Sequence, residues 1–378
     1  MPVPPGVPRA TLGKWAVAGD VVPVVRTETD VVVIGAGQAG LSAAYFLRRS
    51  GLEFVVLDRD SSPGGAWQHR WPSLRLDKVH KFHDLPGMAF DEQDEHRMAS
   101  EVVAEYFARY ERAFELPVRR PVEVVTVRDA GERLLVESAG GDSWAAPAVI
   151  NASGTWTRPF WPHYPGQETF TGRQLHTADY RSAEEFRGQH VLVVGGGTSA
   201  VQLLIEIAEF ASGTTWVTRR PPVFKDVEFS PELGREAVAQ VERRVRAGLP
   251  PGSVVSVTGL MRTPQVRDAE ARGILDRKPM FDHLTPTGVV WPDGTEQRVD
   301  AILWATGFRA ALDHLAPLHL REPGGGIRMD GTRAAAEPRL HLVGYGPSAS
   351  TIGANRAGRA AVREIRQLLE TPKVAAAS

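Results

Sequence analysis

Two stretches of this chain pass from an unbroken apolar run into a glycine-rich turn and then into an amphipathic segment. In residues 30–49 the run VVVI precedes GAGQAG, and in residues 190–210 the run VLVV precedes GGGTSA. Short apolar, β-branched runs are typical of buried parallel strands, and apolar positions three or four residues apart are typical of helices. A further apolar strand follows each stretch, at 54–57 and at 214–218. The pattern predicts two βαβ units, offset by 160 residues.

The remaining segments carry weaker periodicities. Apolar side chains at helical spacing predict a helix over residues 100–114, and short strands between turn residues predict a small antiparallel meander over 122–144. Further strands are predicted at 148–151, 301–303 and 340–343, and further helices at 231–247 and 354–369. This succession indicates an α/β fold with two Rossmann-like dinucleotide-binding domains, of which the second is inserted into the first.

The first glycine turn has the surroundings that a dinucleotide requires. Gly35 permits the tight turn, Gly37 lets the backbone approach a pyrophosphate, and Gly40 lets the helix pack closely on the strand. The free N–H groups at the helix N-terminus suit the phosphates. Asp58, at the end of the next strand, is placed to accept hydrogen bonds from ribose hydroxyls. We therefore expect a nucleotide with an unphosphorylated ribose at this turn.

The second glycine turn repeats most of this pattern. Gly195 and Gly197 are retained, and Ala200 replaces the third glycine with a residue that is still small. Thr198 and Ser199 place two hydroxyls at the start of the following helix, either as phosphate ligands or as helix caps.

The end of the next strand differs between the two units. Arg219, followed by Arg220, stands close to the offset that Asp58 has in the first unit, and no acid is present. A guanidinium binds a phosphate in bidentate fashion, whereas a carboxylate repels it. The second unit is therefore predicted to prefer NADPH, whose ribose carries a 2′-phosphate.

Composition removes several classes of function. The 378 residues carry a net charge of −1, which gives no reason to expect nucleic acid or an anionic membrane as a partner. No apolar run approaches the ~20 residues of a membrane span, and the proline-rich N-terminus lacks the features of a signal peptide, so a cytoplasmic location is expected. The chain has no cysteine, which excludes disulfides and the redox-active cysteine pair of disulfide reductases. We also expect no metal site.

Residues 170–180, FTGRQLHTADY, fit the pattern F-x-G-x-x-x-H-x-x-x-Y. With the two glycine turns, GGAW at 64–67 and ATGF at 305–308, this segment resembles the identifying motif of the flavin-containing monooxygenases. The resemblance covers nearly the whole chain after about residue 28. It is closer to the bacterial branch and the plant auxin-forming branch than to the animal type.

The resemblance implies FAD in the first unit and NADPH in the second. In that family NADPH reduces the flavin, O2 adds at the flavin C4a, and the hydroperoxide passes one oxygen atom to nitrogen or sulfur of a small molecule. The implied division is an N-terminal arm at 1–28, an FAD-binding domain at 29–165 and 309–378, and an NADPH-binding domain at 166–308. The sequence leaves the oligomeric state open, and a homodimer is one of the assemblies that it allows.

The cofactor-binding residues expected from the two turns and the resemblance fall in four groups. They are Gly35, Gly37, Gln38, Gly40, Asp58 and Arg59; Gly65 and Trp67; Gly195, Gly197, Thr198, Ser199, Arg219 and Arg220; and Thr306 and Gly307.

The catalytic residues stay open. Animal-type members carry an asparagine near the flavin, but the corresponding residues 74–86 contain none, and Arg70, Lys78 and His80 are the candidates for its role. The motif histidine, His176, is expected to be structural.

Three other activities remain as alternatives to oxygenation of nitrogen or sulfur. One is Baeyer–Villiger oxidation of a ketone, although those enzymes end the motif with tryptophan where Tyr180 stands. The second is oxidative decarboxylation of a keto acid, as in the plant branch. The third is a flavin reductase that does not oxygenate a substrate.

Overall fold

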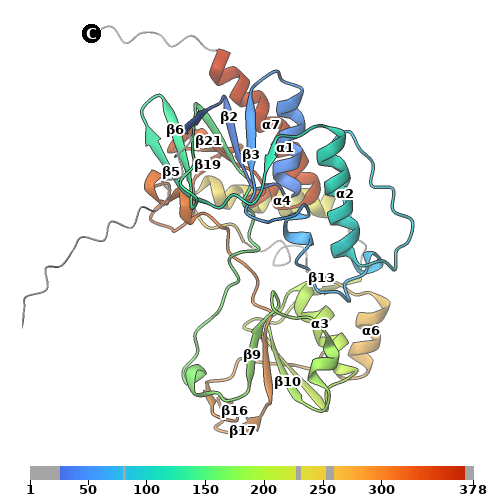
Figure 1. Cartoon of the computed structure of the whole chain (residues 1–378). Coiled ribbons are helices and arrows are strands. Elements are labelled where there is room, and N and C mark those ends of the chain that lie inside the picture. The colour runs from blue at the N-terminus through green and yellow to red at the C-terminus, as the bar shows by residue number, and fades with distance from the viewer. Residues whose placement is uncertain (1–25, 80–81, 227–230, 253–258, 371–378) are drawn as a thin grey trace, which may run out of the picture.

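The computed structural model describes residues 26–79, 82–226, 231–252 and 259–370, which form two α/β units (Figure 1). Both ends of the described chain belong to the upper unit in Figure 1, and the lower unit is inserted between them. The expected N-terminal arm requires a correction. Residues 1–25 lie outside the described residues, but Arg26–Glu28 forms strand β1, which pairs in parallel with Ser143–Ala145.

A seven-stranded sheet forms the centre of the upper unit. Strand β2 (Val31–Ile34) lies between β3 (Phe54–Leu57) and β8 (Ala148–Asn151), and all three are parallel. The sheet continues through β21 (Glu337–Leu342), β20 (Arg333–Ala334) and β19 (Met329–Asp330) on one side and through β4 (Val118–Arg119) on the other. All four residues of β2 are buried, as expected for a strand that is covered on both faces.

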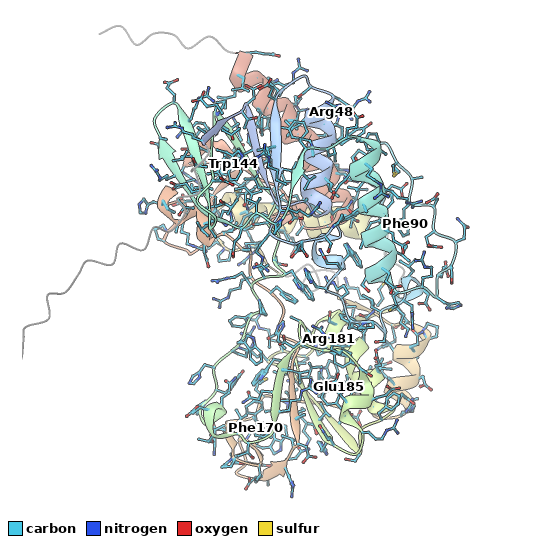
Figure 2. All side chains as sticks on the ribbon, viewed as in Figure 1. Arg48, Phe90, Trp144, Phe170, Arg181 and Glu185 are labelled. Atoms are coloured by element: carbon cyan, nitrogen blue, oxygen red, sulfur yellow. The ribbon has the colours of Figure 1, made fainter. Side chains whose placement is uncertain are left out.

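Successive residues of β2 point to opposite faces of this sheet, and each face has its own cover. Val31 and Val33 pack against helices α1 (Gln38–Arg48), α2 (Ala99–Ala113) and α7 (Thr351–Glu370). Val32 and Ile34 pack against the predicted meander, which consists of β5 (Val124–Ala130), β6 (Arg133–Ser138) and β7 (Ser143–Ala146). Figure 2 shows Trp144 of β7 within this upper unit.

The lower unit has a five-stranded parallel sheet. Its order is β14 (Arg277–Lys278), β11 (Gly213–Val217), β10 (His190–Val194), β18 (Ala301–Trp304) and β9 (Arg173–His176). Helices α3 (Thr198–Ala208) and α6 (Pro264–Ala271) cover one face. An antiparallel sheet of β15 (His283–Thr285), β16 (Gly288–Val290) and β17 (Glu296–Arg298) covers the other.

Short elements complete the described chain. They are strands β12 (Phe224–Lys225) and β13 (Leu260–Met261) and the 3-10 helices η1 (Gly65–Trp67), η2 (Leu76–Lys78), η3 (Gln167–Thr169), η4 (Ala183–Phe186), η5 (Asp313–Leu318) and η6 (Gly346–Ser348). Within the described residues, no helix combines the length and apolar character that crossing a membrane requires.

The two units exchange segments, which changes the expected division of the chain. Helix α4 (Pro231–Arg246) falls within the predicted insertion, yet Val245 packs in the core of the upper unit and lies beside Gly346 of η6. Figure 1 shows α4 in the upper unit. Conversely, Trp71 and Leu74, which fall within the predicted FAD-binding domain, pack in the core of the lower unit around α3. Apolar side chains thus cross the boundary in both directions.

Candidate dinucleotide-binding sites

Each glycine turn follows the carboxyl end of a central parallel strand, at the edge where open α/β sheets bind their ligands. In the upper unit the turn joins β2 to α1, and in the lower unit it joins β10 to α3. Both helices start at a glycine N-cap and have no acidic residue in the first turn. Their free N–H groups are therefore available to an anion.

Two glycines of the first turn are required by the fold itself. Gly35 has a φ of +98°, and a Cβ there would lie 2.6 Å from the Ala152 carbonyl oxygen. A Cβ on Gly40 would lie 1.8 Å from the Gly35 carbonyl oxygen. Neither position accepts a side chain, so these glycines permit the turn and the close packing of α1.

Gly37 is different, because the protein itself does not require a glycine there. Its φ of −81° and ψ of −170° are extended backbone that any residue adopts. A Cβ at Gly37 would meet only the Gly65 Cα among the described residues, at 3.8 Å. A glycine next to such open space suits the close approach of a ligand to the backbone.

Gly65 of η1 borders the same space. It has a φ of +50°, and its own Cβ would lie 2.7 Å from the Gly37 Cα. The two glycines therefore face each other across the turn. Gly197 in the lower unit resembles Gly37, since its φ is −98°, its ψ is 174°, and a Cβ there would meet no described atom within 4 Å.

The N-termini of α1 and α7 meet beside the first turn. The Gln38 side-chain nitrogen lies 3.3 Å from the Asn355 Oδ1, and the Asn355 Nδ2 donates to the Asp84 carbonyl at 2.6 Å. The Gln38 Oε1 is buried and has no hydrogen-bond partner among the described residues. A buried polar atom without a partner is costly unless a ligand or water satisfies it. This atom supports the expectation that Gln38 faces a cofactor.

Asp58 at the end of β3 does not stand alone. Its Oδ2 accepts a hydrogen bond from the Arg120 Nε at 2.8 Å, and the rest of that guanidinium binds Glu111 at 2.6 and 2.7 Å. Burial raises the pKa of Asp58, and the Arg120 charge opposes this shift. Two carboxylates and one guanidinium leave a net charge of −1, which suits ribose hydroxyls and repels a phosphate. Arg59, the next residue, is exposed.

The end of β11 carries the opposite charge. Arg219 and Arg220 are both exposed, and among the described residues no carboxylate forms an ion pair with either. Thr198 and Ser199 lie at the start of α3, and neither hydroxyl has a hydrogen-bond partner in the part of the chain that the structure describes. Two free hydroxyls, free N–H groups and two arginines therefore share this edge of the lower sheet.

Thr306 and Gly307 lie in a paired ribbon that joins the units. The Thr306 hydroxyl donates to the Phe160 carbonyl, and the Phe160 N–H donates to the Gly307 carbonyl at 2.9 Å. Gly307 has a φ of +79°, and a Cβ there would meet no described atom within 4 Å. The ATGF segment is thus part of the connection between the units.

The motif histidine holds this connection. The His176 Nδ1 accepts from the Ala178 N–H at 3.1 Å, and its Nε2 lies 3.0 Å from the Gly307 carbonyl oxygen. This arrangement places the ring proton on Nε2, and burial lowers the pKa of His176, which favours the neutral ring. Its side chain is fully buried, so it has the structural position that the sequence predicts.

The motif tyrosine ties the two units together through α3. The Tyr180 hydroxyl donates to the Glu206 Oε1 at 2.9 Å, and the Ser73 hydroxyl, which belongs to the upper unit, donates to the same oxygen at 2.6 Å. Trp71 packs edge-on against Tyr180. Figure 2 shows Phe170, at the other end of the motif, in the lower unit. The sequence identified this motif but not Glu206 and Ser73.

Replacing Glu206 by alanine is expected to lower the free energy of unfolding by about 2 kcal/mol, because it leaves the Ser73 and Tyr180 hydroxyls without their shared acceptor. Urea unfolding followed by tryptophan fluorescence measures this change. Glu209→Ala is the matched control, since Glu209 forms one exposed ion pair with Arg272 and is expected to cost less than about 1 kcal/mol. Equal costs for the two variants would contradict the account.

Arg70 lies at the junction, and no carboxylate of the described residues forms an ion pair with it. Its guanidinium carbon is 4.9 Å from the centre of the Trp156 ring and 5.7 Å from that of Trp67. Its Nε is buried and has no hydrogen-bond partner among the described residues, and burial lowers the pKa of the guanidinium. Trp156 also stacks on Phe308 of the connecting ribbon. A polar or anionic ligand at this place would give the Arg70 Nε the acceptor that the described residues do not provide.

The other two catalytic candidates receive no such support. The Lys78 side chain is exposed on η2, whereas its backbone is engaged on both sides: its N–H donates to the Arg75 carbonyl at 3.1 Å, and its carbonyl accepts from the Gln202 side chain at 3.1 Å. His80 lies outside the described residues. Within the described residues no group of His, Asp and Glu side chains has the arrangement of a metal site.

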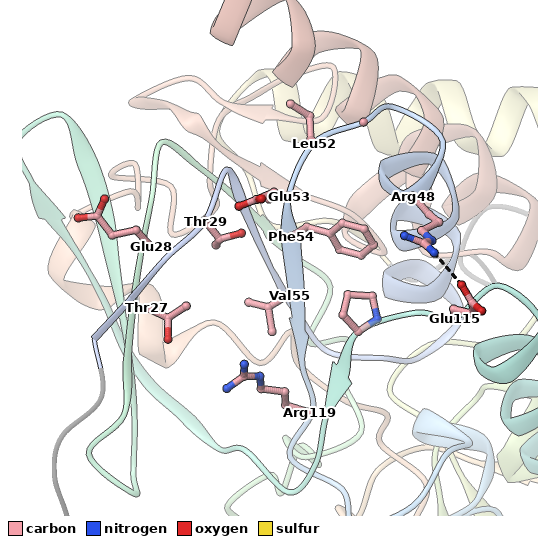
Figure 3. Close-up of a pocket in the computed structure, with 12 residues that line it drawn as sticks. Thr27, Glu28, Thr29, Arg48, Leu52, Glu53, Phe54, Val55, Glu115 and Arg119 are labelled. Carbon is pink, nitrogen blue, oxygen red and sulfur yellow. Dashed lines mark hydrogen bonds and ion pairs between the residues drawn. The ribbon is translucent and has the colours of Figure 1, made fainter.

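A separate pocket of about 530 Å³ opens at the other edge of the upper sheet (Figure 3). It is lined by Thr29, Glu53 and Phe54, which lie at the amino ends of β2 and β3, and by the exposed ion pair of Arg48 and Glu115, 2.7 Å apart. The glycine turn lies at the carboxyl end of β2, so this pocket is not part of the dinucleotide site.

Comparisons with known proteins agree with this geometry. Residues 32–273 match the family model described as pyridine nucleotide-disulphide oxidoreductase. The chain is 41% identical to a flavin-containing monooxygenase from Stenotrophomonas maltophilia, with a TM-score of 0.79, over 91% of this chain and 99% of that one. It is 27% identical to indole-3-pyruvate monooxygenase YUCCA1 from Oryza sativa, over 85% of this chain and 88% of the relative. It is 28% identical to an uncharacterized oxidoreductase, CzcO, from Bacillus velezensis, over 75% and 82%.

Proposed function

This chain belongs to the flavin-containing monooxygenase family, and we propose that it is an NADPH-dependent enzyme that transfers one oxygen atom of O2 to nitrogen or sulfur of a small molecule. The observation that carries the proposal is the pair of glycine turns, which border open space at Gly37 and Gly197. The strand that follows each turn leads to an acid, Asp58, in the upper unit and to a base, Arg219, in the lower unit. Binding of FAD in the upper unit and of NADPH in the lower unit accounts for the open space at both turns and for the opposite charges.

The residues at each turn fit these two cofactors. Gly37, Gly65 and the α1 N-terminus would hold the FAD pyrophosphate, and Asp58 would bind its ribose. Gly197, Thr198 and Ser199 would hold the NADPH pyrophosphate, and Arg219 its 2′-phosphate. When bound, FAD accepts a hydride from NADPH and activates O2, which side chains alone do not do.

The protein's own contribution is to orient the two cofactors and to exclude water. The Ser73–Glu206–Tyr180 contact fixes the lower unit against the upper one, and the His176–Gly307 contact holds the end of the ribbon that joins them. The Arg70 guanidinium, packed against Trp156, adds positive charge at the same junction. These contacts support a fixed distance between the nicotinamide and the flavin, which hydride transfer requires.

A second candidate function is the oxidation of a keto acid. Two observations favour it, namely the half-buried Arg70, whose Nε has no partner and whose guanidinium pairs with no carboxylate among the described residues, which suits a substrate carboxylate, and the likeness to a relative named indole-3-pyruvate monooxygenase. Baeyer–Villiger oxidation is less favoured, because Tyr180 stands where the motif of those enzymes ends with tryptophan.

Product analysis under ¹⁸O2 tests the proposal. The holoenzyme is supplied with NADPH and, in separate reactions, a tertiary amine, a sulfide, a ketone and a keto acid. We expect one ¹⁸O atom in the N-oxide or the sulfoxide and one NADPH consumed for each product. Turnover of the keto acid alone would favour the second candidate. NADPH consumption that yields only hydrogen peroxide with every compound would contradict an oxygenase.

A further inference from the structure

The strand registers place the two units in correspondence residue by residue. In the upper unit Ile34 pairs with Leu57, and in the lower unit Val194 pairs with Val217. The residue that follows is Asp58 in the first case and Thr218 in the second. Thr218, and not Arg219, therefore occupies the position of the ribose-binding acid.

Thr218 is held by an arginine from the neighbouring edge strand. The Arg277 Nε donates to the Thr218 Oγ1 at 2.6 Å, and its Nη2 donates to the Thr218 carbonyl at 3.1 Å. The Thr218 hydroxyl in turn donates to the Arg220 carbonyl at 2.7 Å. Thr218 is only 3% exposed. Arg277 thus fixes the short turn that presents Arg219 and Arg220.

The upper unit has an arginine in a similar place, but its charge is outweighed by those of neighbouring carboxylates. Arg120 follows the edge strand β4 and binds both Asp58 and Glu111, so the group as a whole carries a net charge of −1. Arg277 binds a hydroxyl and a carbonyl, and in the described part of the chain no carboxylate forms an ion pair with it. Its positive charge therefore adds to those of Arg219 and Arg220 at the end of β11.

We propose that Arg277 is a further determinant of 2′-phosphate recognition, which holds the Thr218–Arg220 turn in place and adds a third positive charge beside Arg219. This inference rests on the proposed binding of NADPH to the lower unit. It explains why the position of the acid is taken by a threonine, since a hydroxyl anchors the guanidinium without cancelling its charge. The neighbouring Lys278 points elsewhere, with its Nζ 3.2 Å from the Gln297 Oε1 and 4.6 Å from the Trp291 ring centre.

Two nucleotides that differ by one phosphate test the inference without knowledge of the substrate. Calorimetric titration of the FAD-loaded protein measures the Kd of adenosine 2′,5′-bisphosphate and of adenosine 5′-monophosphate. Arg277→Met is expected to weaken the bisphosphate about tenfold or more and the monophosphate less than about twofold. Arg277→Lys, which keeps the charge but loses the paired hydrogen bonds, is expected to fall in between. Lys278→Met is the control and is expected to change neither affinity more than about twofold.

The outcomes separate this inference from the proposed function. Equal weakening of both nucleotides by Arg277→Met, or no weakening, would overturn the role of Arg277. If Arg219→Ala still weakened the bisphosphate much more than the monophosphate, the assignment of NADPH to the lower unit would stand without a role for Arg277. A wild-type protein with no preference for the bisphosphate would overturn both. Flavin content and circular dichroism confirm that each variant is folded, and Arg277→Lys provides a second test if Arg277→Met is not.

Discussion

Replacing Gly37 by valine is expected to yield a folded protein that retains no FAD. The backbone at Gly37 is extended and accepts any residue, and a Cβ there would meet only the Gly65 Cα among the described residues, at 3.8 Å. The side chain would instead fill the space that the pyrophosphate requires. The measurement is the flavin content of the purified protein, with circular dichroism as the check on folding.

Two other glycine substitutions serve as controls for this result. Gly40→Ala is expected to disturb the fold itself, because its Cβ would lie 1.8 Å from the Gly35 carbonyl oxygen. Gly197→Val is expected to keep the flavin and to lose the binding of NADPH, because the same kind of open space lies in the lower unit. A yellow Gly37→Val protein with normal flavin content would show that FAD is not held at this turn.

Replacing Arg219 by alanine is expected to raise the Kd for NADPH by roughly 10- to 100-fold and to leave the Kd for NADH nearly unchanged. A charge-assisted hydrogen bond contributes roughly 1.5–3 kcal/mol, and only NADPH carries the phosphate that accepts it. Titration of the variant with both nucleotides measures the two constants.

An arginine on the far side of the lower unit provides the control. Arg298 lies on β17 with its side chain 82% exposed, and Arg298→Ala is expected to change neither constant. If Arg219→Ala weakened NADPH and NADH by the same factor, Arg219 would not distinguish the nucleotides.

The core elements of both units could be predicted because each carries a local signal. The apolar runs at 31–34 and 191–194 are strands, and the two glycine turns lead into helices where the spacing predicts them. The separate roles of Gly35 and Gly37 were also predictable from the motif. In the structure the first is required by the backbone, and the second borders open space.

What the sequence did not predict depends on contacts between distant residues. Nothing near Asp58 indicates that Arg120 binds it, 62 residues later. Strand β14 has only two residues, too few for a periodicity, so the contact of Arg277 with Thr218 had no local signal. The offset of Arg219 from its turn predicts that it stands near the position of the acid, whereas strand pairing gives that position to Thr218.

The pattern of apolar and polar residues also does not predict which segments of one unit pack against the other. The amphipathic helix α4 shows that one face must be buried, but not in which unit. Val245 packs in the upper core, and Trp71 packs in the lower one, and each contact joins residues far apart in the chain. The motif residues His176 and Tyr180 form buried hydrogen bonds at this junction, which explains why the motif is informative about the fold.

The central claim is that the lower unit delivers a hydride from NADPH to FAD in the upper unit. Anaerobic mixing of the holoenzyme with one equivalent of NADPH tests it most directly, with the visible absorption of the flavin as the signal. We predict that the absorption disappears in the wild-type protein and persists in Gly197→Val loaded with FAD. A wild-type flavin that stays oxidised, or a Gly197→Val flavin that is reduced equally fast, would contradict the claim.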